Sequence, residues 1–351
     1  MSTAQYATDQ PAGFKNRIEK VAIVGAGGTI GSFFTKELLK TGKHTVTALT
    51  RTGSKSTLPE GVKVANIDYD NHESIVTALR GNDFLIVTLS VRAAPEVSGK
   101  LFAAAEAAGV EYVMPNAYGP NPHNTLMYED MGFGSVFRTA CAEIAKRNLI
   151  PVILSCGFWY EFSLTGGTSR FGFDLANRKA VFFDNGDVKT YTSTWPQCGR
   201  AAAALLSLPI LPKDAADKSP TLSTYAGTNK SAYISSFHVS QKDMYESVKR
   251  VSGTTDADWT VSHEPTKERH ANAAKALQSG GGVKLDGVSE LTAQEAFATL
   301  MYTRVFFPGG DGLKDVDIAN KALGLPLEDI DIATKEAFRM VRDGDLDTYS
   351  Q

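Results

Sequence analysis

The stretch Lys20-Val-Ala-Ile-Val-Gly-Ala-Gly-Gly-Thr-Ile-Gly-Ser-Phe-Phe-Thr-Lys-Glu-Leu-Leu-Lys40 decides the fold. Residues 21–24 are apolar and predict a short buried strand, glycines follow at once, and an amphipathic helix begins near residue 30. This order is typical of dinucleotide sites, because the turn admits a pyrophosphate and the free N–H groups of the helix face the anion. We expect Gly25 to allow the tight turn, Gly28 the approach of the phosphate, and Gly31 the close packing of helix on strand.

The glycines of this turn are evenly spaced. Gly25, Gly28 and Gly31 lie three residues apart, whereas the usual dinucleotide fingerprint would need a glycine where Ile30 stands. The even spacing is typical of short-chain dehydrogenase-like proteins. The turn residues that we expect to contact a cofactor are Gly25, Gly27, Gly28, Thr29, Ile30 and Gly31.

Length and composition indicate an ordinary globular protein. The chain has 351 residues, of which 42% are hydrophobic and 21% charged, with a formal net charge of −3. This balance gives no general attraction to nucleic acid or to an anionic membrane, and no apolar run approaches the ~20 residues that span a bilayer. The N-terminus lacks the apolar core of a signal peptide, and the three cysteines form neither a disulfide framework nor a metal-ligand spacing. We therefore expect a cytoplasmic protein without a bound metal.

Strands and helices alternate through the first half of the sequence. Expected strands cover residues 21–24, 44–49, 62–67, 84–89, 112–114 and 152–154, and expected helices cover 30–40, 72–79, 97–108 and 135–147. The alternation predicts an α/β fold with a Rossmann-type parallel sheet covered by helices on both faces. Farther along, residues 180–183 and 189–192 are expected as strands around the turn at Asn185-Gly186.

The chain is expected to have three parts. Residues 1–18 are predicted to form a flexible leader, 19–156 a cofactor-binding domain, and 157–351 mainly a smaller C-terminal α/β domain that binds substrate. An alternative for the strands of about 188–240 is that they join the first sheet. Ligands of parallel sheets bind beyond the carboxyl ends of the strands, which places the site at the glycine turn and the neighbouring loops.

The end of the second strand indicates which nicotinamide cofactor is bound. An acidic residue there would hydrogen-bond the ribose 2′-OH of NAD, but the sequence reads Thr50-Arg51-Thr-Gly-Ser-Lys55. Arg51 can pair with a 2′-phosphate through two hydrogen bonds, and Lys55 can assist it. The alternative is that both are solvated loop charges. The position favours the first interpretation, so we expect NADPH rather than NADH.

Four segments carry a family resemblance: Gly25-Ala-Gly-Gly-Thr-Ile-Gly31, Leu49-Thr-Arg51, Val113-Met-Pro-Asn-Ala-Tyr-Gly119 and Ile150-Pro-Val-Ile-Leu-Ser-Cys-Gly-Phe158. Over about residues 20–160 the chain resembles the NmrA-like and isoflavone-reductase-like branch of atypical short-chain dehydrogenases, and it looks like the fungal members. The resemblance implies a Rossmann-type sheet, NADP(H) at the glycine turn, and a substrate pocket roofed by the C-terminal part.

The resemblance also implies which loops surround the nicotinamide. Residues 115–119 stand where family reductases have Pro-Ser-Glu-Phe-Gly, and 156–158 correspond to the loop whose aromatic residue packs near the nicotinamide. The further cofactor-binding residues expected are Leu89, Ser90, Pro115, Asn116, Ala117, Cys156 and Phe158. Tyr118, Trp159 and Tyr160 are expected to line the substrate pocket, the alternative being an ordinary aromatic core cluster at 158–160.

At the catalytic position the chain departs from the family. Family reductases have a lysine early in the helix that follows this loop, and Arg138 stands there, twelve residues before Ile150. Arginine stays protonated, so Arg138 can stabilise negative charge but cannot serve as a lysine-type base. The alternatives are binding of the cofactor or of an anionic substrate, and a structural ion pair, for example with Glu143 or Glu129. Tyr118, or a water that it holds, is expected to supply the proton.

These features together predict an NADPH-dependent reductase that transfers hydride to a small carbonyl or conjugated substrate, aromatic or polyketide-like. The alternative is a non-catalytic NADP(H)-binding redox sensor of the NmrA type, which would tolerate loss of the lysine. The aromatic residues 158–160 favour the enzyme. We expect a small-molecule substrate as partner, no nucleic acid and no membrane, and either a monomer or a homodimer.

Overall fold

A computed structural model describes residues 6–90, 93–94, 96–132, 136–279, 283–285, 289–308, 310 and 316–345. Its central strands are β1 (Lys20–Val24), β2 (Thr45–Arg51), β3 (Lys63–Ile67), β4 (Phe84–Val87), β5 (Tyr112–Met114) and β6 (Ile150–Pro151). They form one parallel sheet in the order β3-β2-β1-β4-β5-β6. The chain reverses its direction across the sheet between β1 and β4, the switch point at which doubly wound sheets bind ligands.

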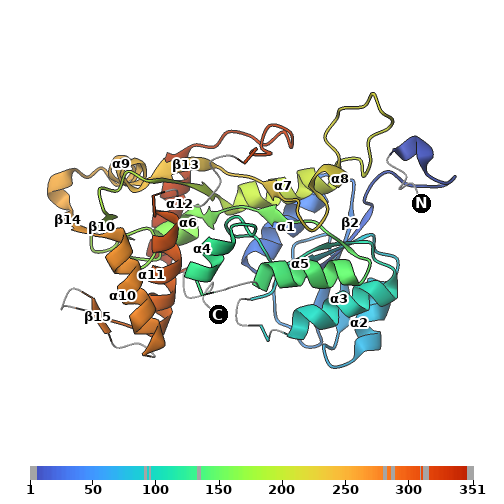
Figure 1. The fold of residues 1–351 in the computed structure, drawn as a ribbon, viewed down its shortest axis with the longest axis horizontal. Coiled ribbons are helices and arrows are strands. Elements are labelled where there is room, and N and C mark those ends of the chain that lie inside the picture. The colour runs from blue at the N-terminus through green and yellow to red at the C-terminus, as the bar shows by residue number, and fades with distance from the viewer. Residues whose placement is uncertain are drawn as a thin grey trace.

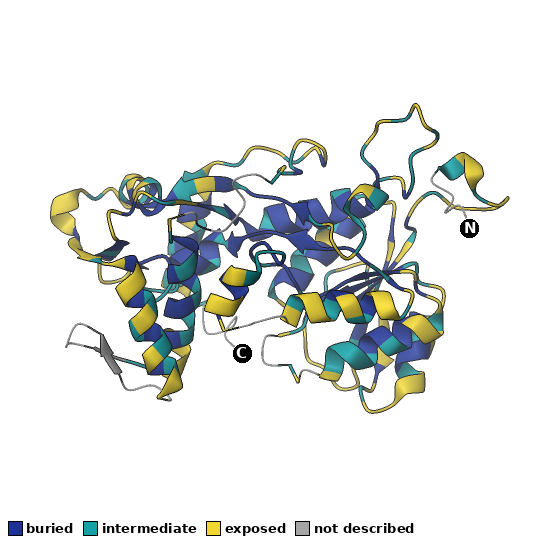
Figure 2. Ribbon diagram, in the orientation of Figure 1, coloured by how far each residue is buried: buried dark blue, intermediate teal, exposed yellow. Residues whose placement is uncertain are grey.

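Helices cover both faces of this sheet (Figure 1). They are α1 (Thr29–Lys40), α2 (His72–Leu79), α3 (Glu96–Ala108), α5 (Val136–Lys146) and α7 (Trp195–Leu206). Successive β1 side chains point to opposite faces: Val21 and Ile23 join the core under α1 and α7, whereas Ala22 and Val24 join the core under α2, α3 and α5. Figure 2 shows the resulting layers, with buried strands between helices whose outer surfaces are exposed. The predicted α/β fold with a parallel sheet is confirmed.

Helix α7 comes from the second half of the sequence but packs against α1. The helix begins with the N-cap Thr194, whose side chain accepts a hydrogen bond from the backbone N–H of Gln197 at 3.1 Å. Gly199 allows the close approach of the two helices, because a Cβ atom there would lie 2.7 Å from the backbone oxygen of Phe33. One face of the first sheet is therefore completed by residues that lie far along the chain.

Most of the remaining elements form smaller sheets and a largely helical lobe at the left of Figure 1. The strands are β7 (Leu154–Ser155), β8 (Phe158–Trp159), β9 (Phe173–Asp174), β10 (Lys179–Phe183), β11 (Lys189–Ser193), β12 (Ala232–Tyr233), β13 (Phe237–Ser240), β14 (Thr260–Glu264), β15 (Val283–Leu285) and β16 (Ser289–Leu291). The helices are α4 (Thr125–Asp130), α6 (Tyr160–Leu164), α8 (Leu222–Tyr225), α9 (Gln241–Ser252), α10 (Thr266–Gln278), α11 (Ala293–Val305) and α12 (Ile330–Asp343), with 3-10 turns at Ala7–Asp9 and Asp256–Asp258. The small sheets have the orders β14-β10-β9, β13-β11-β8, β12-β7 and β15-β16.

The two strands expected around Asn185-Gly186 are present, but they do not form a hairpin. β10 pairs with β9 and β14, whereas β11 pairs with β8 and β13. Asp184 and Gly186 have φ angles of +50° and +70°, and the chain turns there from one sheet into the other. Distant segments supply the hydrogen-bonding partners of both strands, so the two predicted strands are confirmed and lie in different sheets. β12 likewise pairs with β7 rather than with the six-stranded sheet.

The first described residues lie along the segment 210–213. The side-chain amide of Asn16 donates to the backbone oxygen of Leu211 at 2.8 Å, and its oxygen accepts from the Leu211 N–H at 2.7 Å. Ile18 is 2% exposed and packs in the core of the sheet. Residues 16–18 therefore belong to the folded unit, and the division of the chain into domains stays a prediction.

Across the part of the chain that the structure describes, we find no helix with the length and apolar character needed to cross a membrane.

Candidate functional site

Two glycines of the turn between β1 and α1 are required by the packing of the protein itself. Gly25 has a φ of +80°, and a Cβ atom there would lie 2.2 Å from the backbone oxygen of Thr88, just after β4. A Cβ atom on Gly31 would lie 2.1 Å from the backbone oxygen of Gly25. The Thr88 hydroxyl donates to the backbone oxygen of Val24 at 2.7 Å and so ties the ends of β1 and β4 together. The turn, the start of α1 and the end of β4 are therefore in close contact.

Gly28 has a different environment, which leaves room for a ligand. It is the exposed N-cap of α1, and no side chain caps the helix. A Cβ atom there would have only the backbone oxygen of Gly25 within 4 Å, at 3.2 Å. Thr29 is half-buried, and the Ile30 side chain is buried in the core, so the backbone of these residues is what a cofactor would meet. An uncovered helix N-terminus beside glycine fits a pyrophosphate group.

The loop after β2 lies directly over the turn at Gly27. A Cβ atom on Gly27 would lie 2.8 Å from the backbone oxygen of Thr57 and 3.0 Å from the Cβ of Ser56. This loop carries Arg51 and Lys55, which are exposed and have no ion-pair partner among the described residues. Two uncompensated cations close to the glycine turn fit a cofactor with a 2′-phosphate. Nothing in the sequence predicted this close contact of Gly27 with the loop after β2.

The loop after β5 is held by hydrogen bonds to β4 and to the residues that follow β4. The Asn116 amide donates to the backbone oxygen of Leu89 at 2.8 Å, and the Tyr118 hydroxyl donates to the backbone oxygen of Val87 at 2.8 Å. Tyr118 is 3% exposed and lies edge-on to Phe34, and burial holds the pKa of its phenol well above the ordinary value. The role of Tyr118 as proton donor stays a prediction, and it requires the hydroxyl to leave Val87.

The remaining residues expected in this loop region differ in their exposure. Pro115 and Ala117 are buried, whereas Leu89 is half-buried and Ser90 is exposed. A cofactor at the end of β4 could therefore contact the side chain of Ser90 directly. Buried Pro115 and Ala117 instead shape the loop that Asn116 fastens to β4.

The aromatic residues that follow β7 have three different environments. Phe158 is stacked on Tyr302 of α11, with ring centroids 4.1 Å apart, and Cys156 before it is fully buried. Tyr160 is fully buried, and its hydroxyl is hydrogen-bonded to that of Thr334 on α12 at 2.8 Å. Through these contacts Tyr160 fixes α12 against the core. This environment fits the alternative that Tyr160 belongs to an aromatic core cluster.

Trp159 is half-buried and lies in an open cluster of aromatic rings. Its ring centroid is 6.2 Å from those of Phe162 and Trp195, and Trp195 in turn stacks on Phe33 of α1 at 6.0 Å. The indole N–H of Trp159 is buried and has no hydrogen-bond partner among the described residues. The half-buried ring can therefore form part of a wall for an aromatic substrate, whereas its buried N–H does not face that wall.

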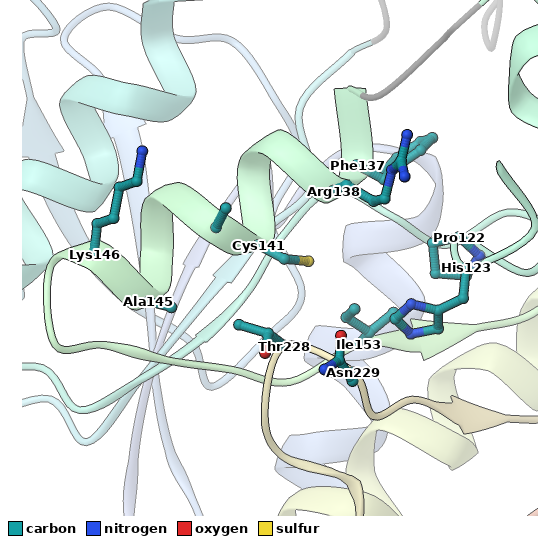
Figure 3. Close-up of a pocket in the computed structure, with 11 residues that line it drawn as sticks. Pro122, His123, Phe137, Arg138, Cys141, Ala145, Lys146, Ile153, Thr228 and Asn229 are labelled. Atoms are coloured by element: carbon teal, nitrogen blue, oxygen red, sulfur yellow. The ribbon is translucent and has the colours of Figure 1, made fainter.

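Arg138 lies in the first turn of α5 and is exposed (Figure 3). It has no ion pair with Glu129 or Glu143 among the described residues, and Glu143 is instead paired with Arg147 at 3.5 Å. Arg138 lines a cavity of about 530 Å³ between α5 and the residues near Asn229. Its guanidinium is therefore free to meet a ligand, and its catalytic role stays a prediction.

Comparisons with known proteins agree with this arrangement. Residues 17–130 match the model of the NmrA-like family. The oxidoreductase aprR of Aspergillus flavus is 26% identical over 317 residues, which cover 89% of this chain and 96% of that protein. A crystal structure from a set of pinoresinol-lariciresinol and phenylcoumaran benzylic ether reductases superposes with a TM-score of 0.70 at 17% identity, over 91% of this chain and 99% of that one. The chain is therefore similar to the NmrA-like, isoflavone-reductase-like family, with the family model matching its first part and the shared fold extending over most of its length.

A second solved structure shows how far the fold extends beyond sequence identity. Leucoanthocyanidin reductase of Vitis vinifera, in a binary complex with NADPH, superposes on this protein with a TM-score of 0.69 at 13% identity. The superposition covers 91% of this chain and 99% of that one. The shared architecture therefore includes the small sheets and the C-terminal lobe as well as the first sheet.

The protein also buries a carboxyl group that the sequence did not lead us to expect in the site. Glu161 is 3% exposed, and burial together with the charge of Glu328 raises the pKa of its carboxyl to about 8. Its oxygen accepts the backbone N–H of Trp195 at 3.4 Å, and no cation pairs with it among the described residues, whereas Glu328 is paired with Arg200 at 2.5 Å. The carboxyl of Glu161 is therefore mainly protonated at neutral pH. One acidic residue inside the aromatic run 158–162 was the available signal.

Proposed function

We propose that this protein is an NADPH-dependent reductase of a small carbonyl or conjugated substrate, aromatic or polyketide-like in character. The observation that carries the proposal is the uncovered glycine turn beside a cationic loop. Gly28 leaves the N-terminus of α1 open, and Arg51 and Lys55 lie on the loop that packs over Gly27. The A. flavus relative is named an oxidoreductase, and the V. vinifera reductase was solved with NADPH, which supports the same assignment.

The residues around the turn would hold the two charged parts of the cofactor separately. The backbone N–H groups at the start of α1 would bind the pyrophosphate, where the helix dipole favours negative charge. Arg51 would bind the 2′-phosphate through its planar guanidinium, with Lys55 as a second cation. NADH lacks that phosphate, so the cationic loop would favour NADPH.

When bound, NADPH would supply a hydride from its nicotinamide ring. The residues of this chain would then position the substrate and stabilise charge. The half-buried ring of Trp159 offers an aromatic surface, next to Phe158, which is fixed in the core by its stack on Tyr302. Arg138 stays charged and would stabilise the negative charge that develops on the reduced substrate. The proton would come from water or from Tyr118 after its hydroxyl has left Val87.

A second candidate function is an NADP(H)-binding redox sensor without turnover. Two observations favour it. Arginine replaces lysine at position 138, and the Tyr118 hydroxyl is used in a buried hydrogen bond. A sensor has to distinguish the oxidised from the reduced cofactor, whereas an enzyme has to consume one of them.

Two measurements separate these functions. The first is calorimetric titration of the purified protein with NADPH, NADP⁺ and NADH, repeated with the Arg51→Gln variant. The second is NADPH consumption at 340 nm with quinones, enones and aromatic aldehydes as substrates. Tight NADPH binding that Arg51→Gln weakens, together with turnover of one substrate class, supports the reductase. Binding of NADP⁺ much tighter than that of NADPH, without turnover, supports the sensor, and no binding of any nucleotide refutes both.

A further inference from the structure

The cavity beside Arg138 lies outside the cofactor site described above. Its lining residues are Pro122, His123, Phe137, Arg138, Cys141, Ala142, Ala145, Lys146, Ile153, Thr228 and Asn229. Arg138 is the one residue that this lining shares with the residues predicted to act in catalysis or cofactor binding. We call this cavity the α5 groove, because every third or fourth residue of α5 from Phe137 to Lys146 forms one of its walls (Figure 3).

The floor of the α5 groove is apolar. Cys141 and Ile153 are 5% and 0% exposed, and both pack with Phe137 against Ala117. In Figure 3 the Cys141 side chain points across the groove towards Ile153 and His123. Burial raises the pKa of the Cys141 thiol to about 11, so this floor carries no charge at neutral pH. A floor of this kind binds a hydrocarbon or aromatic group and excludes a fully polar ligand.

The charges that line the groove are all of one sign. Arg138 and Lys146 are its cations, neither has an ion-pair partner in the described part of the chain, and no aspartate or glutamate is among the lining residues. Lys146 points away from the floor in Figure 3, which leaves Arg138 as the cation nearest to it. Burial lowers the pKa of His123, whose ring is hydrogen-bonded to the Ser231 hydroxyl at 3.0 Å, so this wall is neutral at pH 7.

From this combination we propose that the α5 groove is a second ligand site, which binds a small amphipathic carboxylate with its apolar body on Cys141 and Ile153 and its carboxylate at Arg138. A cavity of about 530 Å³ is within the range of small-molecule sites and accepts one aromatic ring with a short side chain. The planar guanidinium of Arg138 matches a carboxylate through two hydrogen bonds. Exposed Thr228 and Asn229 on the facing wall can bind further polar groups of such a ligand.

The floor of the groove connects this second site to the proposed active site. Ala117 belongs to the loop that is expected beside the nicotinamide, and it packs on the same Cys141 and Ile153 that the ligand would cover. The groove and the glycine turn use different residues, so the groove ligand and the cofactor can be bound at the same time, whereas a substrate that contacts Arg138 would compete with the groove ligand for its guanidinium. A ligand in the groove would therefore contact the residues that pack under the loop 115–119, so that its binding would be coupled to that of the cofactor.

Calorimetric titration with 4-phenylbutyrate, and with the neutral 4-phenylbutanamide as the matched ligand, tests the proposal with and without saturating NADPH. We expect the carboxylate to bind about tenfold more tightly than the amide, and Arg138→Gln to remove that preference. Ala145→Trp, which fills the groove from an exposed helix position, should weaken the binding of both ligands at least tenfold. Ala107→Trp on α3 places the same ring on an exposed position outside the groove and should change neither.

Three results would overturn the proposal: equal affinity for the carboxylate and the amide, wild-type binding by Ala145→Trp, or displacement of the probe by NADPH. Thermal unfolding of each variant checks that the fold is retained. The test also separates this proposal from the proposed function, because the probe needs no bound nucleotide. Probe binding without any NADPH binding would refute the reductase and leave the groove assignment standing.

Discussion

Replacing Gly28 by alanine at the glycine turn should weaken cofactor binding strongly and lower the stability of the fold only slightly. Gly28 has φ −77° and ψ 176°, an extended conformation that alanine adopts without strain. The added Cβ would lie 3.2 Å from the backbone oxygen of Gly25, a tight contact that a small shift relieves. Alanine is a poorer N-cap than glycine, so we expect a loss of at most about 1 kcal/mol in the free energy of unfolding.

The same methyl group should strongly weaken NADPH binding. It would occupy the open space at the N-terminus of α1, where the pyrophosphate approaches the backbone. Loss of about two hydrogen bonds to a charged group, at roughly 1.5 kcal/mol each, corresponds to about 100-fold in Kd. Calorimetric titration with NADPH measures this change, and thermal unfolding measures the stability of the same sample.

Gly31→Ala is the matched control, because it places the same methyl group three residues along the chain. Its Cβ would lie 2.1 Å from the backbone oxygen of Gly25 and 2.6 Å from the hydroxyl oxygen of Thr88, and neither contact can be relieved without moving α1 from β1. We expect this variant to lose about 3 kcal/mol or more of stability. If Gly28→Ala binds NADPH as tightly as the wild type, the assignment of the pyrophosphate to this turn is refuted.

Three further variants test other parts of the site. Arg51→Gln should weaken NADPH binding about tenfold and NADH binding less than twofold, and equal effects on both would exclude a contact with the 2′-phosphate. Glu161→Gln removes a carboxyl whose pKa is raised in the folded state from 4.5 to about 8, so that the folded protein holds a proton that the unfolded chain releases between these values. The free energy of unfolding of the wild type should therefore fall as the pH rises through this window and level off above it. The melting temperature of the glutamine variant, measured relative to that of the wild type, should rise over the same window. Parallel pH profiles of the two melting temperatures would contradict this. Tyr118→Phe leaves the buried oxygen of Val87 without its donor and should lower the free energy of unfolding by about 1–3 kcal/mol, with NADPH affinity within twofold of the wild type. A 100-fold fall in kcat with unchanged stability would instead identify Tyr118 as the proton donor.

Much of the first sheet could be predicted because short segments of sequence encode it. Apolar strands, polar helix faces and the glycine turn are each set by neighbouring residues, and the regular alternation leaves few topologies other than a parallel sheet. The same local signals located Arg51 at the end of β2 and the loop 115–119 after β5. The same kind of signal predicted the two strands on either side of Asn185-Gly186, but a turn dipeptide does not reveal which strands will pair, and these two lie in different sheets.

The sequence by itself determined the order of strands and helices and the glycine turn, and its family resemblance predicted that Arg138 stands where family reductases have a lysine. Only the tertiary structure decided which side chains are buried and which partners they find. Glu161 is next to Tyr160 in the chain, but its pKa is raised by burial and by the charge of Glu328, which lies far along the sequence, against the lowering effect of the hydrogen bond from the Trp195 N–H. Burial and electrostatic environment are sums over atoms brought together by the whole fold, whereas turns and periodicity depend on adjacent residues, which is why local features could be predicted and these could not.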